Sequence, residues 1–295
     1  MLAAAFAQQA PVFRAGVDLV NLAVTVTDRR GNLNANLKAG DFDVFEDGKR
    51  QTIRNFTVGE SASGPGPDLH IAVMLDVSES MVEQLSFTKT AAIRFLNSLL
   101  DAADITVVDF DSEVRVARYG QEDFPRLVER IRQQNAKGTT ALYDAIGVYL
   151  HGAAGQDGRK IMVLYTDGGD TVSSLRSGEL IDLLEASDVT VFTIGSLTSV
   201  LPDFRSRQRA ILTQIAEVTG GEAFFPISVS DVDGIYRRIL AQIRTQYLIG
   251  YISSNEKTDG TWRKIDVKIV SKDAREYQVR ARNGYFAKYK AAERP

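Results

Sequence analysis

From Leu69 to about Thr245, runs of apolar residues alternate with segments in which apolar residues recur every three or four positions. Leu69–Leu75 is apolar almost throughout, which is typical of a strand buried on both faces of a parallel sheet. The segments between such runs have the spacing of amphipathic helices. A chain that repeats strand and helix in this way is expected to form a doubly wound, mostly parallel α/β sheet.

The same pattern predicts the individual elements of this sheet. The expected strands are Leu69–Leu75, Ile105–Phe110, Lys160–Tyr165, Val189–Ile194 and Ala223–Phe225. The expected helices run from about Met81 to Leu99 and over Phe124–Gln134, Ala141–Leu150, Ser177–Ala186, Phe204–Val218 and Val232–Arg244.

The two flanks of this region alternate apolar and polar residues, as half-buried β-strands do. In the N-terminal flank, Asp47-Gly48 predicts a hairpin turn between Asp41–Phe45 and Gln51–Phe56. In the C-terminal flank, alternating segments at Lys264–Ile269 and Tyr277–Arg282 precede an Asn283-Gly284 turn. Each flank is too short to bury a core of its own, so we expect the two flanks to pair into one β-sandwich.

These boundaries make the α/β domain an insertion in the sandwich. The expected divisions are an N-terminal β segment at 11–60, a Gly/Pro/Ser-rich linker at 61–67, the α/β domain at 68–245, a C-terminal β segment at 246–286 and a tail at 287–295. Residues 1–10 contain a short apolar run that ends in Ala5-Phe6-Ala7. This is the Ala-x-Ala sequence after which a signal peptidase cleaves. We therefore expect a signal-peptide remnant and an exported protein, periplasmic, secreted or on the cell surface, with a frayed N-terminus as the alternative. No later stretch has the length of a transmembrane segment.

Composition excludes several classes of partner and site. The chain has 35 Lys and Arg against 38 Asp and Glu, a net charge of −3, which argues against nucleic-acid binding. It has no Cys, and His70 and His151 are its only histidines, so thiolate and imidazole metal sites are excluded. A metal ion would have to be held by oxygen atoms.

Oxygen-bearing side chains follow the predicted strands at the edge where ligands of α/β sheets bind. Asp76, Ser78 and Ser80 come directly after the first strand, at alternate positions of one loop. Thr140 precedes the helix Ala141–Leu150, and Asp167 follows the strand Lys160–Tyr165.

With these residues the sequence resembles the von Willebrand factor type A family, whose metal-ion-dependent adhesion site consists of Asp-x-Ser-x-Ser, a Thr and an Asp. The resemblance covers roughly Leu69 to Thr245. The flanks resemble the VWFA-related acidobacterial domain of secreted bacterial proteins, through Phe42-x-Val-Phe-Glu-Asp-Gly and the closing Arg282-Asn-Gly-Tyr-Phe.

The resemblance implies a Mg²⁺ ion held by Asp76, Ser78, Ser80, Thr140 and Asp167, with Mn²⁺ or Ca²⁺ as alternatives. Mg²⁺ prefers about six oxygen ligands in an octahedron, so a site of this kind retains open positions. The family implies that an Asp or Glu of a protein partner completes the coordination, and that the last helix, Val232–Arg244, shifts as affinity changes. No oligomeric state follows from the sequence.

Structural roles are the alternative for each of these residues. Ser80 with Glu83 has the spacing of a capping box, Thr140 could be only a helix N-cap, and Asp167-Gly168 could be only a turn. Glu83 also lies where integrin-like relatives place a ligand for a second ion, although helix capping is the preferred interpretation.

Other polar residues are expected to have ordinary structural roles. Asp111 and Asp144 are interpreted as turn and helix-surface acids, and His70 as a satisfied histidine within a strand. The arginines at positions 205, 207 and 209 are expected on a solvated face. The loop Leu197–Phe204 is expected to shape the recognition face.

Three functions remain in competition. The preferred one is a non-enzymatic, metal-dependent module that binds a protein. The second is a haloacid-dehalogenase-like hydrolase with Asp76 as nucleophile, which is disfavoured because Ser78 stands where the proton-handling carboxylate is needed. The third is a structural domain that the metal only stabilises, with no open coordination position.

Overall fold

The apolar runs form one six-stranded sheet in the computed structural model, which describes residues 19–59, 67–99, 102–228, 230–271 and 274–289. The strand order is β10-β9-β8-β5-β6-β7, in which β7 alone runs antiparallel to its neighbour. The strands are β5 (Leu69–Asp76), β6 (Asp104–Phe110), β7 (Val114–Tyr119), β8 (Arg159–Thr166), β9 (Val189–Gly195) and β10 (Ala223–Phe224).

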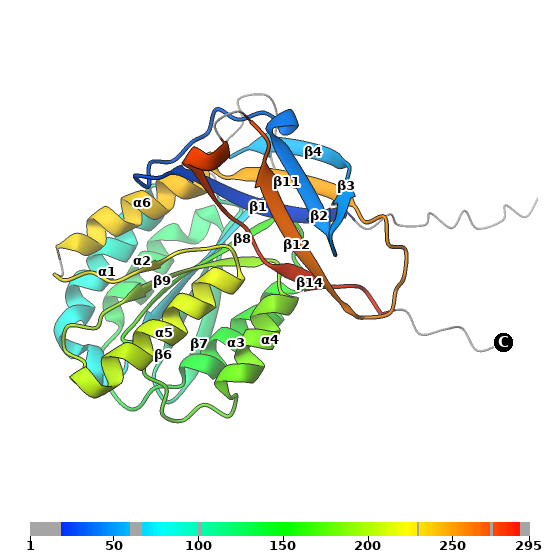
Figure 1. Ribbon diagram of the computed structural model, residues 1–295. Helices are drawn as coiled ribbons and strands as arrows, with labels where there is room; N and C mark the ends of the chain where they lie inside the picture. Colours follow the sequence, from blue (N-terminus) through cyan, green and yellow to red (C-terminus); the bar gives the residue numbers. More distant parts are fainter. Residues whose placement is uncertain (1–18, 60–66, 100–101, 229, 272–273, 290–295) are drawn as a thin grey trace, which may run out of the picture.

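Helices cover both faces of this sheet (Figure 1). One face packs against α1 (Val82–Asn97), α2 (Phe124–Gln133) and α6 (Asp231–Thr245), and the other against α3 (Leu142–Ala153), α4 (Ser177–Ala186) and α5 (Pro202–Val218). Because successive side chains of a strand point to opposite faces, Val73 and Leu75 of β5 enter the first core while Ala72 and Met74 enter the second. This explains why β5 is apolar throughout.

The predicted fold class is confirmed, and the structure adds one strand. The segment Val114–Tyr119 was not expected to be regular, yet it forms the edge strand β7. The segment reads Val-Arg-Val-Ala-Arg-Tyr and has no fully buried residue, and Val116 is 45% exposed, as suits an edge strand rather than one of the apolar interior strands. Short 3₁₀ turns occur at Ala39–Asp41, Glu79–Met81, Gln121–Asp123 and Ala274–Glu276.

The flanks form a β-sandwich, as predicted. Its two sheets have the orders β13-β1-β11-β4 and β14-β12-β2-β3, and each sheet takes strands from both flanks. The strands are β1 (Leu19–Asp28), β2 (Phe42–Glu46), β3 (Lys49–Gln51), β4 (Ile53–Val58), β11 (Tyr247–Ile252), β12 (Trp262–Ile269), β13 (Tyr277–Arg280) and β14 (Gly284–Phe286). In Figure 1 the sandwich lies above and to the right of the α/β unit.

The predicted hairpin turn is confirmed, and one expected strand divides. Asp47 and Gly48 have φ angles of 49° and 80°, which the tight turn between β2 and β3 requires. The run Gln51–Phe56 was expected to be one strand. It breaks at Thr52, because Gln51 pairs with β2 while Ile53 begins β4 and pairs with β11 in the opposite sheet.

Some expectations fall on residues that the structure does not describe. The signal-peptide remnant at 1–10, residues 61–66 of the linker and residues 290–295 of the tail lie outside the described residues. None of the helices in the described part of the chain combines the length and apolar character needed to cross a membrane.

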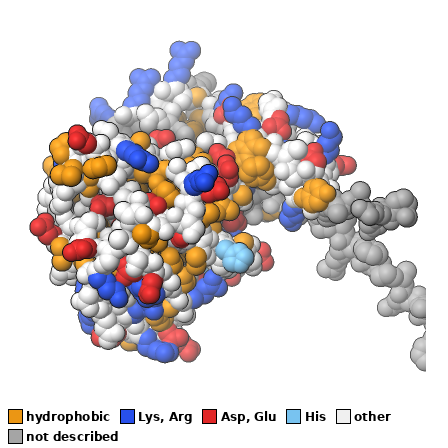
Figure 2. Space-filling view, turned by 90° about the horizontal axis from the view of Figure 1, so that it is seen from below, with side chains coloured by type: hydrophobic (Ala, Val, Ile, Leu, Met, Phe, Trp, Pro, Cys, Tyr) orange, Lys and Arg blue, Asp and Glu red, His pale blue; other side chains and the backbone are white. Residues whose placement is uncertain are grey.

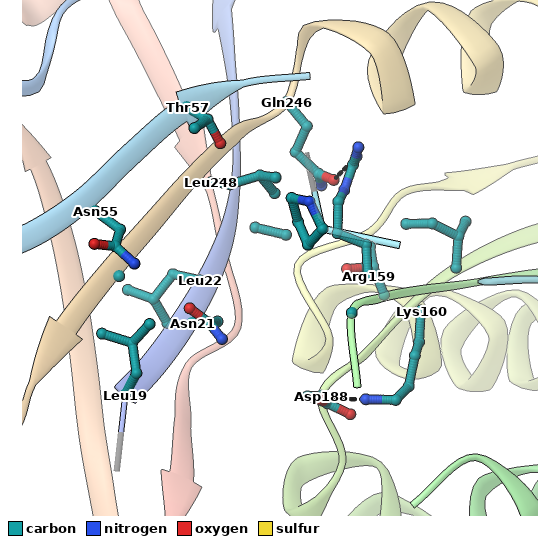
Figure 3. A pocket seen from close by; sticks show the side chains of 16 residues that line it. Leu19, Asn21, Leu22, Asn55, Thr57, Arg159, Lys160, Asp188, Gln246 and Leu248 are labelled. Atoms are coloured by element: carbon teal, nitrogen blue, oxygen red, sulfur yellow. Dashed lines mark hydrogen bonds and ion pairs between the residues drawn. The ribbon is translucent and has the colours of Figure 1, made fainter. Parts of the chain in front are cut away.

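Polar contacts join the sandwich to the α/β unit. Arg280 of β13 forms an ion pair of 2.7 Å with Glu222, and Arg282 donates a hydrogen bond of 3.5 Å to the Ser187 carbonyl. A cavity of about 280 Å³ remains between the two units, bordered by the Lys160–Asp188 ion pair (Figure 3). Because Lys160 lies near the start of β8, this cavity lies at the amino-terminal edge of the sheet.

A buried charge network holds one end of the sandwich together. Glu46 and Arg263 are 2% and 1% exposed, with 3.4 Å between Glu46 Oε1 and Arg263 Nη1. The Tyr251 and Tyr285 hydroxyls donate to Glu46 Oε2 at 2.8 and 2.9 Å. Breaking one partner of such a network leaves a buried charge without compensation.

We therefore expect Arg263→Met to lower the free energy of unfolding by about 3–5 kcal/mol, because Glu46 loses its cation. Urea unfolding followed by circular dichroism measures the change. The matched control is Lys268→Met, whose ion pair with Asp266 is exposed and should contribute about 0–1 kcal/mol. Equal effects of the two variants would contradict a structural role for the buried network.

Candidate functional site

The central strand β5 ends in a buried carboxylate. Asp76 is 0% exposed, its Oδ1 accepts a hydrogen bond from the Ser78 backbone N–H at 3.0 Å, and its Oδ2 accepts one from the Thr166 hydroxyl at 2.6 Å. Because β5 lies between β8 and β6, its carboxyl end is in the middle of the sheet edge. The strand order therefore places Asp76 at the centre of the candidate site.

The loop after Asp76 brings two hydroxyl groups together. Ser78 is buried and Ser80 is exposed, and their Oγ atoms are 3.2 Å apart. The alternative interpretation of Ser80 and Glu83 as a capping box is wrong. Helix α1 begins at Val82, and its N-cap is Met81 without a side-chain cap hydrogen bond. The Ser80 hydroxyl is thus not used to cap the helix.

Thr140 lies in the loop before α3. Its backbone N–H donates to the Thr171 hydroxyl at 2.9 Å, and its carbonyl accepts from the Thr171 and Val172 N–H groups. The N-cap interpretation of Thr140 is wrong, since the N-cap of α3 is Ala141 and has no side-chain cap hydrogen bond. These backbone contacts join the Thr140 loop to the loop that follows β8.

Asp167 comes directly after β8. Its Oδ1 accepts a hydrogen bond from the Gly169 N–H at 2.7 Å, and Gly168 has a φ of 81°, so the predicted turn is present. The side chain also lines a pocket of about 200 Å³ together with Ser80. Asp167 therefore has a turn contact and a position at the site.

The structure brings the five predicted residues to one edge of the sheet through three loops. Thr166 links the Asp76 loop to the Asp167 loop, and the Glu79 N–H donates to the Gly138 carbonyl at 3.1 Å, which links the Asp76 loop to the Thr140 loop. The Thr140 hydroxyl makes no hydrogen bond with the side chains of the other four residues, all of which are described. Only a ligand bound by all five side chains would connect the Thr140 hydroxyl to the other four.

The two carboxylates are not neutralised by protein cations. Among the described residues, neither Asp76 nor Asp167 forms an ion pair. The pKa of Asp76 is raised to about 6, mainly by burial; hydrogen bonds from Ser78 and Thr166 act in the opposite direction, and the nearby charge of Asp167 contributes to the rise. A divalent cation would remove this electrostatic cost.

The donor set fits a hard cation. Two carboxylates and three hydroxyls are oxygen ligands, which Mg²⁺ prefers, and Asp76, Ser78, Ser80, Thr140 and Asp167 could hold it. Within the described residues, no three His, Cys, Asp or Glu side chains come together as a metal site. Metal binding here would therefore depend on the hydroxyl groups as well as the carboxylates.

Two acids have different roles from those expected. Asp111 is only 1% exposed and pairs with Arg115 at 3.0 Å, so it is a buried ion-pair partner as well as a turn residue. Asp144 is not simply a surface acid of α3, because its carboxylate accepts hydrogen bonds from the N–H groups of Ser174 and Leu175. It thereby holds the chain that follows the Asp167 loop.

Other expectations are confirmed. His70 is satisfied by Asp104 at 2.9 Å and by the Asp157 carbonyl at 2.8 Å. The arginines at positions 205, 207 and 209 are exposed, and the guanidinium of Arg209 also lies over the Phe225 ring at 3.9 Å. On the face seen in Figure 2, acidic and basic side chains are interspersed, in agreement with the balanced composition.

The sequence analysis missed two residues of the pocket, Gln84 and Gln208. Each has a buried Oε1 atom without a hydrogen-bond partner among the described residues. Gln84 follows Ser80 by one helical turn, whereas Gln208 comes from α5. No local pattern links the two, because the tertiary structure alone brings α1 and α5 to the same pocket.

Comparisons with known proteins identify the α/β unit. The family model described as von Willebrand factor type A domain matches residues 70–238. None of the curated proteins compared matches the chain.

Solved structures share the fold at low sequence identity. A von Willebrand factor type A protein from Catenulispora acidiphila has a TM-score of 0.52 and 16% identity, over 94% of this chain and 65% of that one. The PilB minor pilin from Streptococcus sanguinis has a TM-score of 0.50 and 11% identity, over 63% of each chain. The pilus adhesin SpaC from Lactobacillus rhamnosus GG has a TM-score of 0.50 and 10% identity, over 84% of this chain and 48% of that one.

The raised pKa of Asp76 predicts a pH-dependent stability in the absence of divalent metal. Below about pH 4 the carboxyl is protonated in both folded and unfolded states, and above about pH 6 it must ionise in a buried site, at a cost of roughly 3 kcal/mol. The free energy of unfolding of the metal-free protein should therefore fall by that amount as the pH rises from about 4 to above 6.

The Asp76→Asn variant removes the charge and keeps the size of the side chain. In EDTA, its free energy of unfolding relative to the wild type should rise by up to roughly 3 kcal/mol between about pH 4 and pH 7. Urea unfolding at both pH values measures this difference. The exposed Asp203→Asn variant is the control, and a difference for Asp76→Asn that does not depend on pH would contradict the prediction.

Proposed function

The chain belongs to the von Willebrand factor type A domain family, and we propose from this that it is a metal-ion-dependent protein-binding module. In this proposal it is not an enzyme, and it acts outside the cytoplasm. A Mg²⁺ ion is held by the five oxygen-bearing residues, and an Asp or Glu of a protein partner completes its coordination.

The observation that carries the proposal is a pair of carboxylates that form no ion pair with any cation among the described residues. Asp76 and Asp167 together offset the charge of one divalent ion, and the remaining ligands are neutral hydroxyls. An ion with neutral ligands at its other positions stays electrophilic, so it favours an incoming carboxylate. Mn²⁺ or Ca²⁺ would fit the same oxygen set.

Exposed apolar side chains near the site support a protein partner. Val82 in the first turn of α1 is 62% exposed, and Leu201 and Phe204 at the start of α5 are 66% and 55% exposed. Large apolar side chains on a surface that also holds a polar site are typical of protein interfaces. We include the loop Leu197–Phe204 in this recognition face, as predicted from the sequence.

The similar structures agree with an adhesive role outside the cell. One is named a pilus adhesin and another a minor pilin. These names support our proposal of adhesion and export, to which the Ala5-Phe6-Ala7 sequence also contributes.

The hydrolase alternative has no support in the site. Ser78 cannot supply the proton transfer that a second carboxylate would. A metal with a purely structural role is the remaining alternative, and it differs from our proposal in predicting no open coordination position for a partner's carboxylate.

Calorimetric titration of Mg²⁺ into metal-stripped protein tests the metal site. We expect one ion to bind the wild type, and Asp76→Ala and Asp167→Ala to weaken its binding at least ~100-fold, because each removes a charged ligand. Circular dichroism checks that the variants fold. Asp203→Ala, which removes an exposed carboxylate from α5, is the control and should bind Mg²⁺ like the wild type.

Selection from a phage-displayed library of random seven-residue peptides tests the binding function. Peptides retained in Mg²⁺ should be enriched in Asp and Glu and should be released by EDTA, because their carboxylate completes the metal coordination. Retention that is equal in Mg²⁺ and EDTA would overturn the proposal, as would equal retention by the Asp167→Ala variant.

A further inference from the structure

A pocket of about 200 Å³ adjoins the proposed metal site. Two of the proposed metal ligands, Ser80 and Asp167, form one side of this pocket. Its other walls come from α1, the loop after β9 and α5. A partner that binds the metal through a carboxylate would therefore place its neighbouring residues over this pocket.

Two glutamines in the walls have unsatisfied amides. Gln84 is 5% exposed, and its Nε2 donates to the Ser199 hydroxyl at 2.9 Å, which leaves Oε1 without a partner among the described residues. Gln208 Oε1 is also buried and unpaired within the described part of the chain. A buried polar atom without a partner costs about 1–3 kcal/mol, so such atoms call for an explanation.

The terminal amide of a glutamine turns about its last bond over a broad range, so either glutamine can present its free group to a ligand in the pocket.

The polarity of the pocket selects among ligand groups. A cation is disfavoured beside a bound divalent ion, and a second carboxylate is disfavoured beside Asp167. An apolar group would leave the glutamines unpaired. A neutral carboxamide both donates and accepts hydrogen bonds, and it therefore complements Gln84 and Gln208 in either orientation.

We propose that this pocket, lined by Gln84 and Gln208, binds the carboxamide of an Asn or Gln side chain in the protein partner, close in sequence to the acidic residue on the metal. The exposed side chains of Leu201 and Phe204 line the same pocket and pack against the aliphatic part of that residue. This inference rests on the proposed function and specifies the chemical class of the partner.

The test uses a phage-displayed library of seven-residue peptides with Asp fixed at the centre, selected on the full chain in Mg²⁺. Asn and Gln should be enriched at one position near the Asp. A synthetic peptide from this selection should bind about tenfold more tightly than the same peptide with Ala at that position, as expected for one or two added hydrogen bonds.

Gln208→Met and Gln84→Met keep the side-chain length and remove the amide. Each variant should reduce the preference for the carboxamide peptide over its Ala counterpart to below about threefold, while the Ala peptide binds as before. Because Gln208 lies in the largely exposed first half of α5, we expect Gln208→Met to fold, and it provides the test if Gln84→Met does not fold. Gln133→Met, on the exposed face of α2, is the matched control and should keep the full preference.

The outcomes separate this inference from the proposed function. If acidic peptides bind in a Mg²⁺-dependent way without any preference for Asn or Gln, the carboxamide pocket is wrong and the metal-dependent function stands. An unchanged preference in both glutamine variants would also overturn the pocket. If no acidic peptide depends on Mg²⁺, the proposed function fails, and the pocket proposal fails with it.

Discussion

The buried carboxylate of Asp76 is the constraint around which the functional end of the molecule is organised. It lies at the end of an interior strand, accepts hydrogen bonds from Ser78 and Thr166, and has no ion-pair partner among the described residues. Burial raises its pKa to about 6, so its negative charge is costly in the folded chain. A divalent ion bound by both Asp76 and Asp167 would neutralise this charge, and the electrostatic energy relieved would favour metal binding.

The loops around Asp76 are held by contacts that leave the candidate ligands available. Backbone hydrogen bonds fix the Thr140 loop against Thr171, and Asp144 binds the N–H groups of the following segment. The caps that could have occupied Ser80 and Thr140 are not formed. The hydroxyls of Ser80 and Thr140 are thus not engaged as helix caps.

The sandwich and the candidate ligands lie at opposite edges of the α/β sheet. The sandwich adjoins the amino-terminal edge of the sheet, where the Lys160–Asp188 ion pair borders the cavity of Figure 3. The candidate ligands lie at the carboxyl-terminal edge, where ligands of open α/β sheets bind. The insertion in the chain therefore leaves the proposed binding face uncovered by the sandwich.

Local sequence was sufficient to predict the helices, the interior strands of the α/β sheet and the Asp47-Gly48 turn, because side-chain periodicity and turn conformation depend on residues close in the chain. It also placed Asp76, Ser78 and Ser80 in one loop. The convergence of Thr140 and Asp167 on that loop was expected from the family resemblance and from the common edge of parallel strands. Only the tertiary structure decided that Thr52 separates two sheets and that Gln84 meets Ser199 across a pocket, because these arrangements depend on contacts between distant segments that no local pattern encodes.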